Sequence, residues 1–197
     1  MTSGDDGPAL LVVADAVAWR AWLDVHESDT DGVRLVLAKK NVTEPTSLTY
    51  AEALDEALCS GWIDGRRNSR DEATFVQLFT PRRARSIWSQ RNVGIIERLT
   101  AEGRMRARGW TEVERARADG RWERAYAGQA GAAVPSDLEA ALAVSPRAAR
   151  RFSGLPAAER YSVLHPILSA PSDAVRAARI RRAVIRLAGE DDASSSA

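Results

Sequence analysis

The segment from Ala57 to Asn92 constrains the fold more than any other part of the sequence. Two runs of strand length, residues 62–66 and 74–79, flank a polar turn, and Pro81 ends the second run. Strand-forming residues on both sides of a polar turn are typical of a β-hairpin. An apolar pattern at helical spacing begins shortly afterwards, so we predict that the hairpin leads into a helix.

The rest of the sequence predicts strands before the hairpin and helices after it. Residues 10–14 and 33–38 have the length and composition of strands, and Asp15 and Thr49 can each cap a following helix. The candidate helix starts further along are Thr111, Ser136, Ser145 and Ser172. We therefore expect an α+β fold with a small, mostly antiparallel sheet of about four strands, covered by helices and followed by a helical C-terminal part.

Composition suggests how the chain is organised. Residues 9–127 form the predicted α+β core domain, which carries the motifs GWIDG and FTPR/WSxxN, and residues 136–188 form the predicted helical subdomain. The stretch 128–135, which is rich in glycine and alanine, is the predicted linker between them. Residues 1–8 and 189–197 are polar end segments, and we expect them to be disordered tails.

Length and charge exclude several classes of protein. The 197 residues are 45% hydrophobic and 28% charged, which is ordinary for a soluble protein and argues against disordered and membrane classes. The formal net charge of +1 leaves no global field that would attract nucleic acid. A single cysteine, Cys59, excludes an internal disulfide and suits a reducing compartment. Because the start MTSGDD is acidic where a secretory signal is positive, we expect a cytoplasmic protein.

Polar and aromatic side chains concentrate around the predicted hairpin. A few fixed polar atoms on apolar walls are what a ligand pocket requires. Arg82 and Arg83 precede a predicted helix start, where backbone N–H groups and guanidinium groups favour an anion. We therefore predict a site for a small anionic ligand. Its predicted residues are Lys39, Trp62, Asp64, Arg82, Arg83, Ser86, Trp88, Ser89 and Asn92.

Asp64 is the candidate catalytic residue. A carboxylate in a partly apolar wall can act as a general acid or base, because burial raises its pKa and a guanidinium group lowers it. The alternative is that Asp64 pairs with Arg82 or Arg83 and holds the hairpin to the loop, with Trp88 in the core and Asn92 as a local cap. The sequence has no metal-ligand spacing, phosphate-binding loop or nucleophile motif, so we predict neither a metal nor a cofactor.

Several motifs together resemble a known family. They are Gly61-Trp62-Ile63-Asp64-Gly65, Phe79-Thr80-Pro81-Arg82-Arg83, Ser86-x-Trp88-Ser89-x-x-Asn92 and Gly103-Arg104-Met105. With these motifs the chain resembles the YdeI/OmpD-associated family, also called bacteriocin-protection proteins, over most of residues 15–188. Val175 and Ala178 depart from the family pattern in the last helix, whereas Arg176, Arg179 and Ile180 fit it. The resemblance implies protection against bacteriocins or cationic antimicrobial peptides, association with an outer-membrane porin, and an α+β domain with a helical C-terminal part.

Three functions are compatible with these observations. The first is a cytoplasmic stress- or toxin-protection protein that binds a small anionic ligand without catalysing a reaction. The second is an enzyme that acts on a small anionic or amide substrate, with Asp64 as general acid or base and the arginines as electrostatic stabilisers. The third is weak binding of nucleic acid or an acidic surface through the arginine-rich last helix, residues 176–186.

Overall fold

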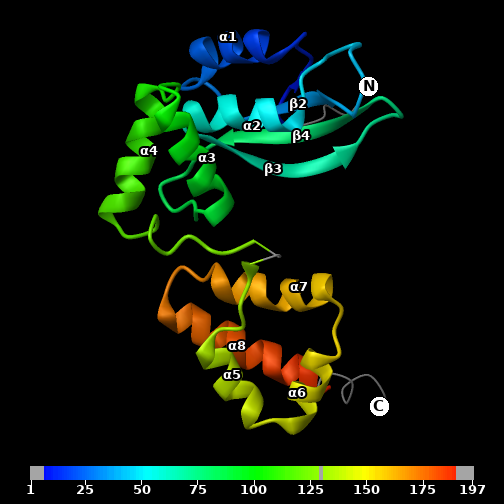
Figure 1. Ribbon diagram of the computed structural model, residues 1–197, viewed down its shortest axis with the longest axis vertical. Helices are drawn as coiled ribbons and strands as arrows, with labels where there is room; N and C mark the ends of the chain where they lie inside the picture. Colours follow the sequence, from blue (N-terminus) through cyan, green and yellow to red (C-terminus); the bar gives the residue numbers. More distant parts are fainter. Residues whose placement is uncertain (1–6, 129–130, 190–197) are drawn as a thin grey trace, which may run out of the picture. The chain divides into compact units, whose positions relative to one another are not determined.

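The computed structural model describes residues 7–128 and 131–189 (Figure 1). Contacts between residues group the chain into two compact units, an α+β unit of residues 1–86 and 92–123 and a helical unit of residues 87–91 and 124–197. The predicted disordered tails lie outside the described residues except for residues 7, 8 and 189. Residues 129 and 130 of the predicted linker also lie outside them.

The α+β unit contains a four-stranded sheet. Its strands are β1 (Leu10–Leu11), β2 (Val33–Ala38), β3 (Trp62–Ser69) and β4 (Thr74–Pro81), in the order β1-β2-β4-β3. The pairing of β1 with β2 is parallel and the other pairings are antiparallel, so the sheet is mixed and the α+β fold class is confirmed. The predicted strand at residues 10–14 is only two residues long. It lies at the sheet edge, and the chain leaves the sheet there to reach the helix that Asp15 caps.

The hairpin of β3 and β4 forms where the sequence predicts it and is longer than predicted. Its register runs from Trp62 opposite Pro81 to Ser69 opposite Phe75, with a bulge between Asp64 and Arg67. The residues that lengthen β3 are polar and exposed. Polar and charged residues are usual on an edge strand, where they discourage pairing with other chains, and they give no apolar signal in the sequence.

Two helices cover one face of the sheet, as Figure 1 shows. They are α1 (Ala16–His26) and α2 (Tyr50–Cys59). Asp15 caps α1 by accepting a hydrogen bond from the Ala18 N–H at 2.9 Å, and Thr49 forms the predicted capping box with Glu52 at the start of α2. Both caps are confirmed. They depend only on residues within three positions of each other, which is why the sequence could predict them.

The next two helices end the α+β unit. They are α3 (Gln90–Ala101), which begins directly after Ser89, and α4 (Ala107–Ala118). The prediction that Thr111 begins a helix is wrong, because α4 begins four residues earlier. The Thr111 hydroxyl instead donates a hydrogen bond to the Ala107 carbonyl at 3.0 Å. Threonine makes this bond inside helices as well as at their starts, so its side chain alone does not locate a helix start.

The helical unit has its own apolar core. Its helices are α5 (Ser136–Ala143), α6 (Pro146–Ser153), α7 (Ala157–Leu168) and α8 (Asp173–Ala188). Pro146 occupies the first helical position of α6, and Ser172 caps α8 by accepting a hydrogen bond from the Val175 N–H, both as predicted. The buried core residues are Leu138, Leu142, Ala148, Phe152, Val163, Leu164, Ile167, Ile180, Ala183 and Leu187.

A buried carboxylate connects α2 to the segment before α4. Glu56 is only 6% exposed, and its two carboxylate oxygens accept hydrogen bonds from Arg104 at 2.7 Å and from Arg106 at 2.5 Å. Although burial alone lowers the pKa of Arg104, its hydrogen bonds to Glu56 and Glu102 raise that pKa overall. Arg106 also donates a hydrogen bond to the Ser60 hydroxyl at 2.5 Å. We call Glu56, Arg104, Arg106 and Ser60 the Glu56 network.

Candidate functional site

Trp62, one of the predicted ligand-binding residues, is a core side chain. It is fully buried, and its indole Nε1 donates a hydrogen bond to the Glu27 carbonyl at 3.2 Å. Its ring makes edge-to-face contacts with Trp19 and Trp22, with centroid distances of 6.4 and 5.9 Å. Such pairs stabilise an apolar core beyond the area that they bury. Trp62 therefore packs α1 against the sheet and presents no exposed surface to a ligand.

Asp64 interacts with a residue that the sequence did not suggest. The hydroxyl of Tyr50, the first residue of α2, donates a hydrogen bond to Oδ2 of Asp64 at 2.8 Å. Within the described residues, Asp64 makes no hydrogen bond or ion pair with Arg82 or Arg83. The interaction of Asp64 therefore joins β3 to α2, and does not join the hairpin to the loop. A role of Asp64 as general acid or base stays a prediction.

Hydrogen bonds within the loop and to Gly61 hold the loop after β4 in place. The Arg82 N–H donates to the Gly61 carbonyl at 3.0 Å, and the Arg82 side chain is buried with 5% exposure. The Arg83 N–H donates to the Ser86 hydroxyl at 2.9 Å, and the Ser86 N–H donates back to the Arg83 carbonyl at 2.8 Å. Asn92 is also buried, at the start of α3. The Ser86 hydroxyl thus has a structural role in this turn.

Arg121 contacts this loop and was not among the predicted site residues. Its Nη1 donates a hydrogen bond to the Ser86 carbonyl at 2.7 Å, and its Nε donates to Asp119 at 2.8 Å. Its Nη2 is buried without an acceptor among the described residues. None of the motifs described in the sequence analysis contains Arg121.

The other predicted residues lie in different places. Lys39 lies at the hairpin turn, where its Nζ donates to the Asp71 carbonyl at 2.8 Å and its N–H donates to the Ala73 carbonyl at 2.9 Å. Asp64 pairs with Phe79, five residues along β4 from Thr74, which is about 17 Å at the usual strand rise. Lys39 and Asp64 are therefore at opposite ends of the hairpin.

Trp88 and Ser89 belong to the helical unit. The Trp88 carbonyl accepts a hydrogen bond from the Tyr126 N–H at 3.0 Å, and Ser89 forms a parallel β-bridge with Tyr126. Trp88 is 2% exposed. These residues therefore pair with the segment that follows the α+β unit in the sequence.

Cys59 is a buried free thiol at the end of α2. Burial, with a further contribution from the charge of Glu56, raises the pKa of Cys59 to about 11. Thiolate is the nucleophilic form of cysteine, so this thiol is protonated and inert at neutral pH. In the described part of the chain, no three His, Cys, Asp or Glu side chains are grouped to hold a metal ion. No helix there is both long and apolar enough to cross a membrane.

The raised pKa of Cys59 predicts a loss of stability at high pH. The unfolded chain ionises Cys59 near pH 9, whereas the folded chain keeps it protonated to about pH 11. Its contribution is therefore complete below pH 9 and should fall by about 2 kcal/mol as the pH rises to 11. Urea denaturation of wild type and Cys59→Ala between pH 8 and 11 measures this difference. A constant difference across that range would contradict the raised pKa.

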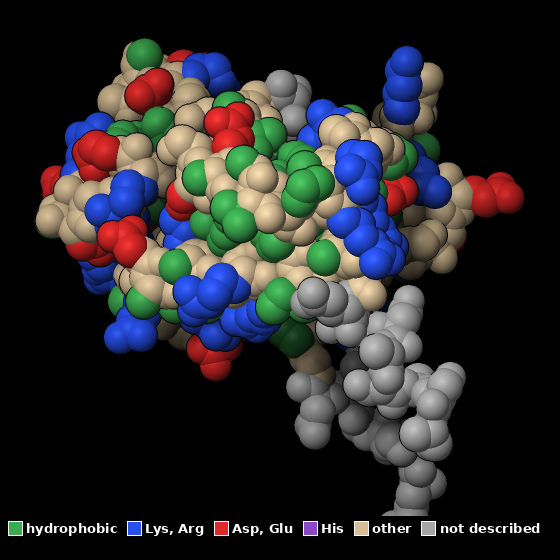
Figure 2. Space-filling model, turned by 90° about the horizontal axis from the view of Figure 1, so that it is seen from below, with side chains coloured by type: hydrophobic (Ala, Val, Ile, Leu, Met, Phe, Trp, Pro, Cys, Tyr) green, Lys and Arg blue, Asp and Glu red, His purple; other side chains and the backbone are tan. Residues whose placement is uncertain are grey.

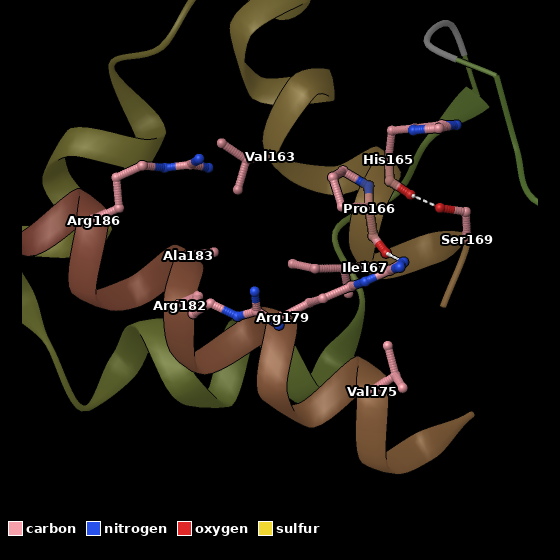
Figure 3. A pocket seen from close by; sticks show the side chains of 10 residues that line it. All are labelled: Val163, His165, Pro166, Ile167, Ser169, Val175, Arg179, Arg182, Ala183 and Arg186. Atoms are coloured by element: carbon pink, nitrogen blue, oxygen red, sulfur yellow. Dashed lines mark hydrogen bonds between the residues drawn. The ribbon is translucent and has the colours of Figure 1, made fainter. Parts of the chain in front are cut away.

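A cavity of about 530 Å³ lies between α7 and α8 in the helical unit (Figure 3). Its lining residues are Val163, His165, Pro166, Ile167, Ser169, Val175, Arg179, Arg182, Ala183 and Arg186. No acidic side chain is among these described lining residues. The cavity thus combines three arginines with an apolar floor. We call it the α7–α8 cavity.

Two arginines of α8 stabilise the fold. Arg179 donates a hydrogen bond to the Pro166 carbonyl, and Arg176 donates to the Ile167 carbonyl at 3.4 Å. These carbonyls lie in the last turn of α7, where a helix lacks internal donors and its dipole attracts cations. Arg176 also binds Asp137 with contacts of 2.6 and 2.9 Å, and these hydrogen bonds lower the pKa of Asp137. Both arginines hold α8 against its neighbours.

Arg182 and Arg186 are available to a ligand. Both are exposed residues of α8 that line the cavity, and neither makes a hydrogen bond or ion pair with the described residues. The ring of His165 packs against Tyr126 and Tyr161, and Figure 3 shows it turned away from the three arginines. Guanidinium groups match carboxylate and phosphate oxygens with paired hydrogen bonds. The cavity is therefore suited to an anion.

The surface charge is mixed on the face that Figure 2 shows. Basic and acidic side chains are interspersed there around an area of hydrophobic side chains. Nucleic acid is usually bound by a continuous basic surface, which this face does not have among the described residues. The local positive charge of the α7–α8 cavity is therefore a clearer electrostatic feature than any basic surface on this face.

Comparison with protein families divides the chain in a similar way. Residues 11–112 match the model of a family described as Domain of unknown function (DUF8412). Residues 132–189, which contain the α7–α8 cavity, match the family described as Bacteriocin-protection, YdeI or OmpD-Associated. The resemblance is thus confirmed in the C-terminal part, whereas the hairpin motifs lie in the other match. Neither a curated protein nor a solved structure matches the chain.

Proposed function

The chain belongs to the DUF8412 family, and its residues 132–189 match the model of the bacteriocin-protection, YdeI or OmpD-associated family. From this premise we propose that it protects by binding a small anionic ligand. The ligand would occupy the α7–α8 cavity. One observation supports this proposal most, namely that Arg182 and Arg186 line a cavity without any acidic residue in its described lining.

Placing the arginines of α8 close together costs free energy. Like charges on one helix repel each other, and nearby carboxylates usually offset the repulsion. Arg176 has such a partner in Asp137, and Arg179 has the Pro166 carbonyl. Arg182 and Arg186 have no such partner among the described residues, so an anion placed between them gains hydrogen bonds without having to displace an internal carboxylate.

The proposal also covers the cell compartment and the partner. We propose the cytoplasm because Cys59 is the only cysteine in the sequence and is a buried free thiol, as is usual in reducing compartments. The family description names OmpD, so we include an association with a porin in the proposal. The cavity and the porin association are separate proposals and need separate tests.

Removing the two arginines should abolish anion binding. We expect inorganic phosphate to raise the melting temperature of the wild type, and an Arg182→Ala/Arg186→Ala variant to bind phosphate at least about tenfold more weakly, because each charge-assisted hydrogen bond contributes about 1.5–3 kcal/mol. Isothermal titration calorimetry and thermal shift measure the two effects.

Arg181→Ala is the matched control. Arg181 is an exposed arginine on the same helix but does not line the cavity, so its loss removes the same charge without touching the site. Equal weakening in Arg181→Ala would show that phosphate responds only to net charge. Absence of phosphate binding to the wild type would remove the proposed function.

A further inference from the structure

We infer that the ligand of the α7–α8 cavity is amphipathic, with an anionic head group on a hydrocarbon body. This inference rests on the proposed function and names the class of its ligand. It follows from three properties of the cavity, namely its volume, its apolar floor and the distribution of charge along its length.

The volume exceeds what a simple anion needs. The cavity holds about 530 Å³, within the usual range of about 300–1,000 Å³ for small-molecule sites. A water molecule takes about 30 Å³ in the liquid, so the cavity has room for well over ten waters. An inorganic phosphate has only five heavy atoms and would fill a small part of this space. A ligand that fills the cavity therefore has a body as well as a charged group.

The floor of the cavity is apolar. Val163, Ile167 and Ala183 line it and are 7%, 1% and 5% exposed, because their other contacts are in the core of the helical unit. Water over such a floor has few hydrogen-bonding partners. A hydrocarbon group gains free energy when it replaces this water, and a polar body does not. The floor thus favours a ligand with an apolar body.

Charge is not uniform along the cavity. The lining residues of α8 run from Val175 to Arg186, a distance of about 16 Å at 1.5 Å per residue. Arg182 and Arg186 lie toward one end, and Val175 lies at the other, as Figure 3 shows. Arg179, between them, is engaged by the Pro166 carbonyl. Val175 is therefore an apolar lining residue that stands apart from Arg182 and Arg186, where a hydrocarbon body can extend away from a head group held by these two arginines.

The test compares three soluble probes by calorimetry, namely n-octyl phosphate, inorganic phosphate and n-octanol. We expect n-octyl phosphate to bind at least tenfold more tightly than inorganic phosphate, since two buried methylene groups are enough for about that factor. We expect n-octanol, which lacks the anionic group, to bind more weakly than n-octyl phosphate. Equal affinities of n-octyl phosphate and inorganic phosphate would overturn the inference and leave the proposed function intact.

A variant at Val175 separates the two parts of the ligand. Val175→Asn should reduce the preference for n-octyl phosphate severalfold and leave the affinity for inorganic phosphate unchanged. Val144→Asn is the control, because Val144 is in the same unit, is 86% exposed and does not line the cavity. If Val175→Asn weakened both probes equally, or if Val144→Asn had the same effect as Val175→Asn, the hydrocarbon end would be misplaced and the inference would fail.

The same head group can come from a membrane lipid or from a free amphiphile. Flotation with vesicles of phosphatidylglycerol, but not of phosphatidylcholine, would assign it to a bilayer lipid. Binding of n-octyl phosphate without flotation would assign it to a free amphiphile. Either result supports an amphipathic anion.

Discussion

A Glu56→Ala variant should lose about 3 kcal/mol of the free energy of unfolding, the loss expected when one partner of a buried ion pair is removed. Glu56 is 6% exposed and accepts hydrogen bonds from two arginines at 2.7 and 2.5 Å. The side chain of Arg106 is 14% exposed, so the substitution leaves its charge largely buried, with the half-exposed Asp24 at 3.2 Å as the carboxylate that remains beside it. Arg104, with a side chain that is 33% exposed, recovers more of its interaction from water.

Urea denaturation followed by tryptophan fluorescence measures this loss, since Trp19, Trp22 and Trp62 all report on the α+β unit. Glu102→Ala is the matched control, because Glu102 also binds Arg104 but has a side chain that is 40% exposed. We expect a much smaller change in the control, as exposed ion pairs contribute little. Similar losses in the two variants would mean that burial of Glu56 adds nothing to its interaction.

The secondary structure that the sequence predicted depends on local interactions. Strand β2 has the predicted bounds Val33–Ala38, and the caps at Asp15 and Thr49 form as predicted. The strand depends on the local pattern of its own residues, and each cap depends on a hydrogen bond within a few residues. The helix start expected at Thr111 failed because the position of α4 depends on its packing against α2, which local sequence does not specify.

The candidate site was harder to predict because register and packing are not local. Lys39 and Asp64 lie at opposite ends of the hairpin, and the side chain of Trp62 is in the core. The arginine-rich stretch of the last helix was visible in the sequence. Some of its arginines donate hydrogen bonds to carbonyls of α7 or to Asp137, and these contacts form only in the folded chain.

The contacts of α8 can be compared with the family pattern described for the last helix. Arg176, Arg179 and Ile180 fit the pattern, and in the structure the two arginines hold α8 to α5 and α7 while Ile180 lies in the core. Val175 departs from the pattern and lines the α7–α8 cavity. Arg176, Arg179 and Ile180 thus maintain the fold, although Arg179 also lines the cavity, and of the two departures only Val175 lines it.

A close approach of α4 to α2 gives a second large prediction. Gly109 lies in α4, and a Cβ atom at this position would be 2.2 Å from the Cys59 carbonyl oxygen and 2.9 Å from the carbonyl carbon. These are backbone atoms at the end of α2 and cannot rotate away. Gly109→Ala must therefore move α4 away from α2, which also strains the hydrogen bond of 3.2 Å from the Arg106 N–H to the Cys59 carbonyl. We expect a loss of about 3 kcal/mol, the upper part of the range for overpacked cores.

Gly94→Ala provides a control of opposite sign. Gly94 is an exposed residue of α3, and a Cβ atom there would have no neighbour within 4 Å. Alanine in a helix is favoured over glycine by about 0.5–1 kcal/mol, so this variant should be more stable than the wild type. The denaturation midpoints of the two variants, each compared with that of the wild type, measure the expected loss and the expected gain in stability. If Gly109→Ala were as stable as the wild type or more stable, α4 would not approach α2 as closely as the structure shows. That result would also weaken the case for the Glu56 network, because the network spans the same junction.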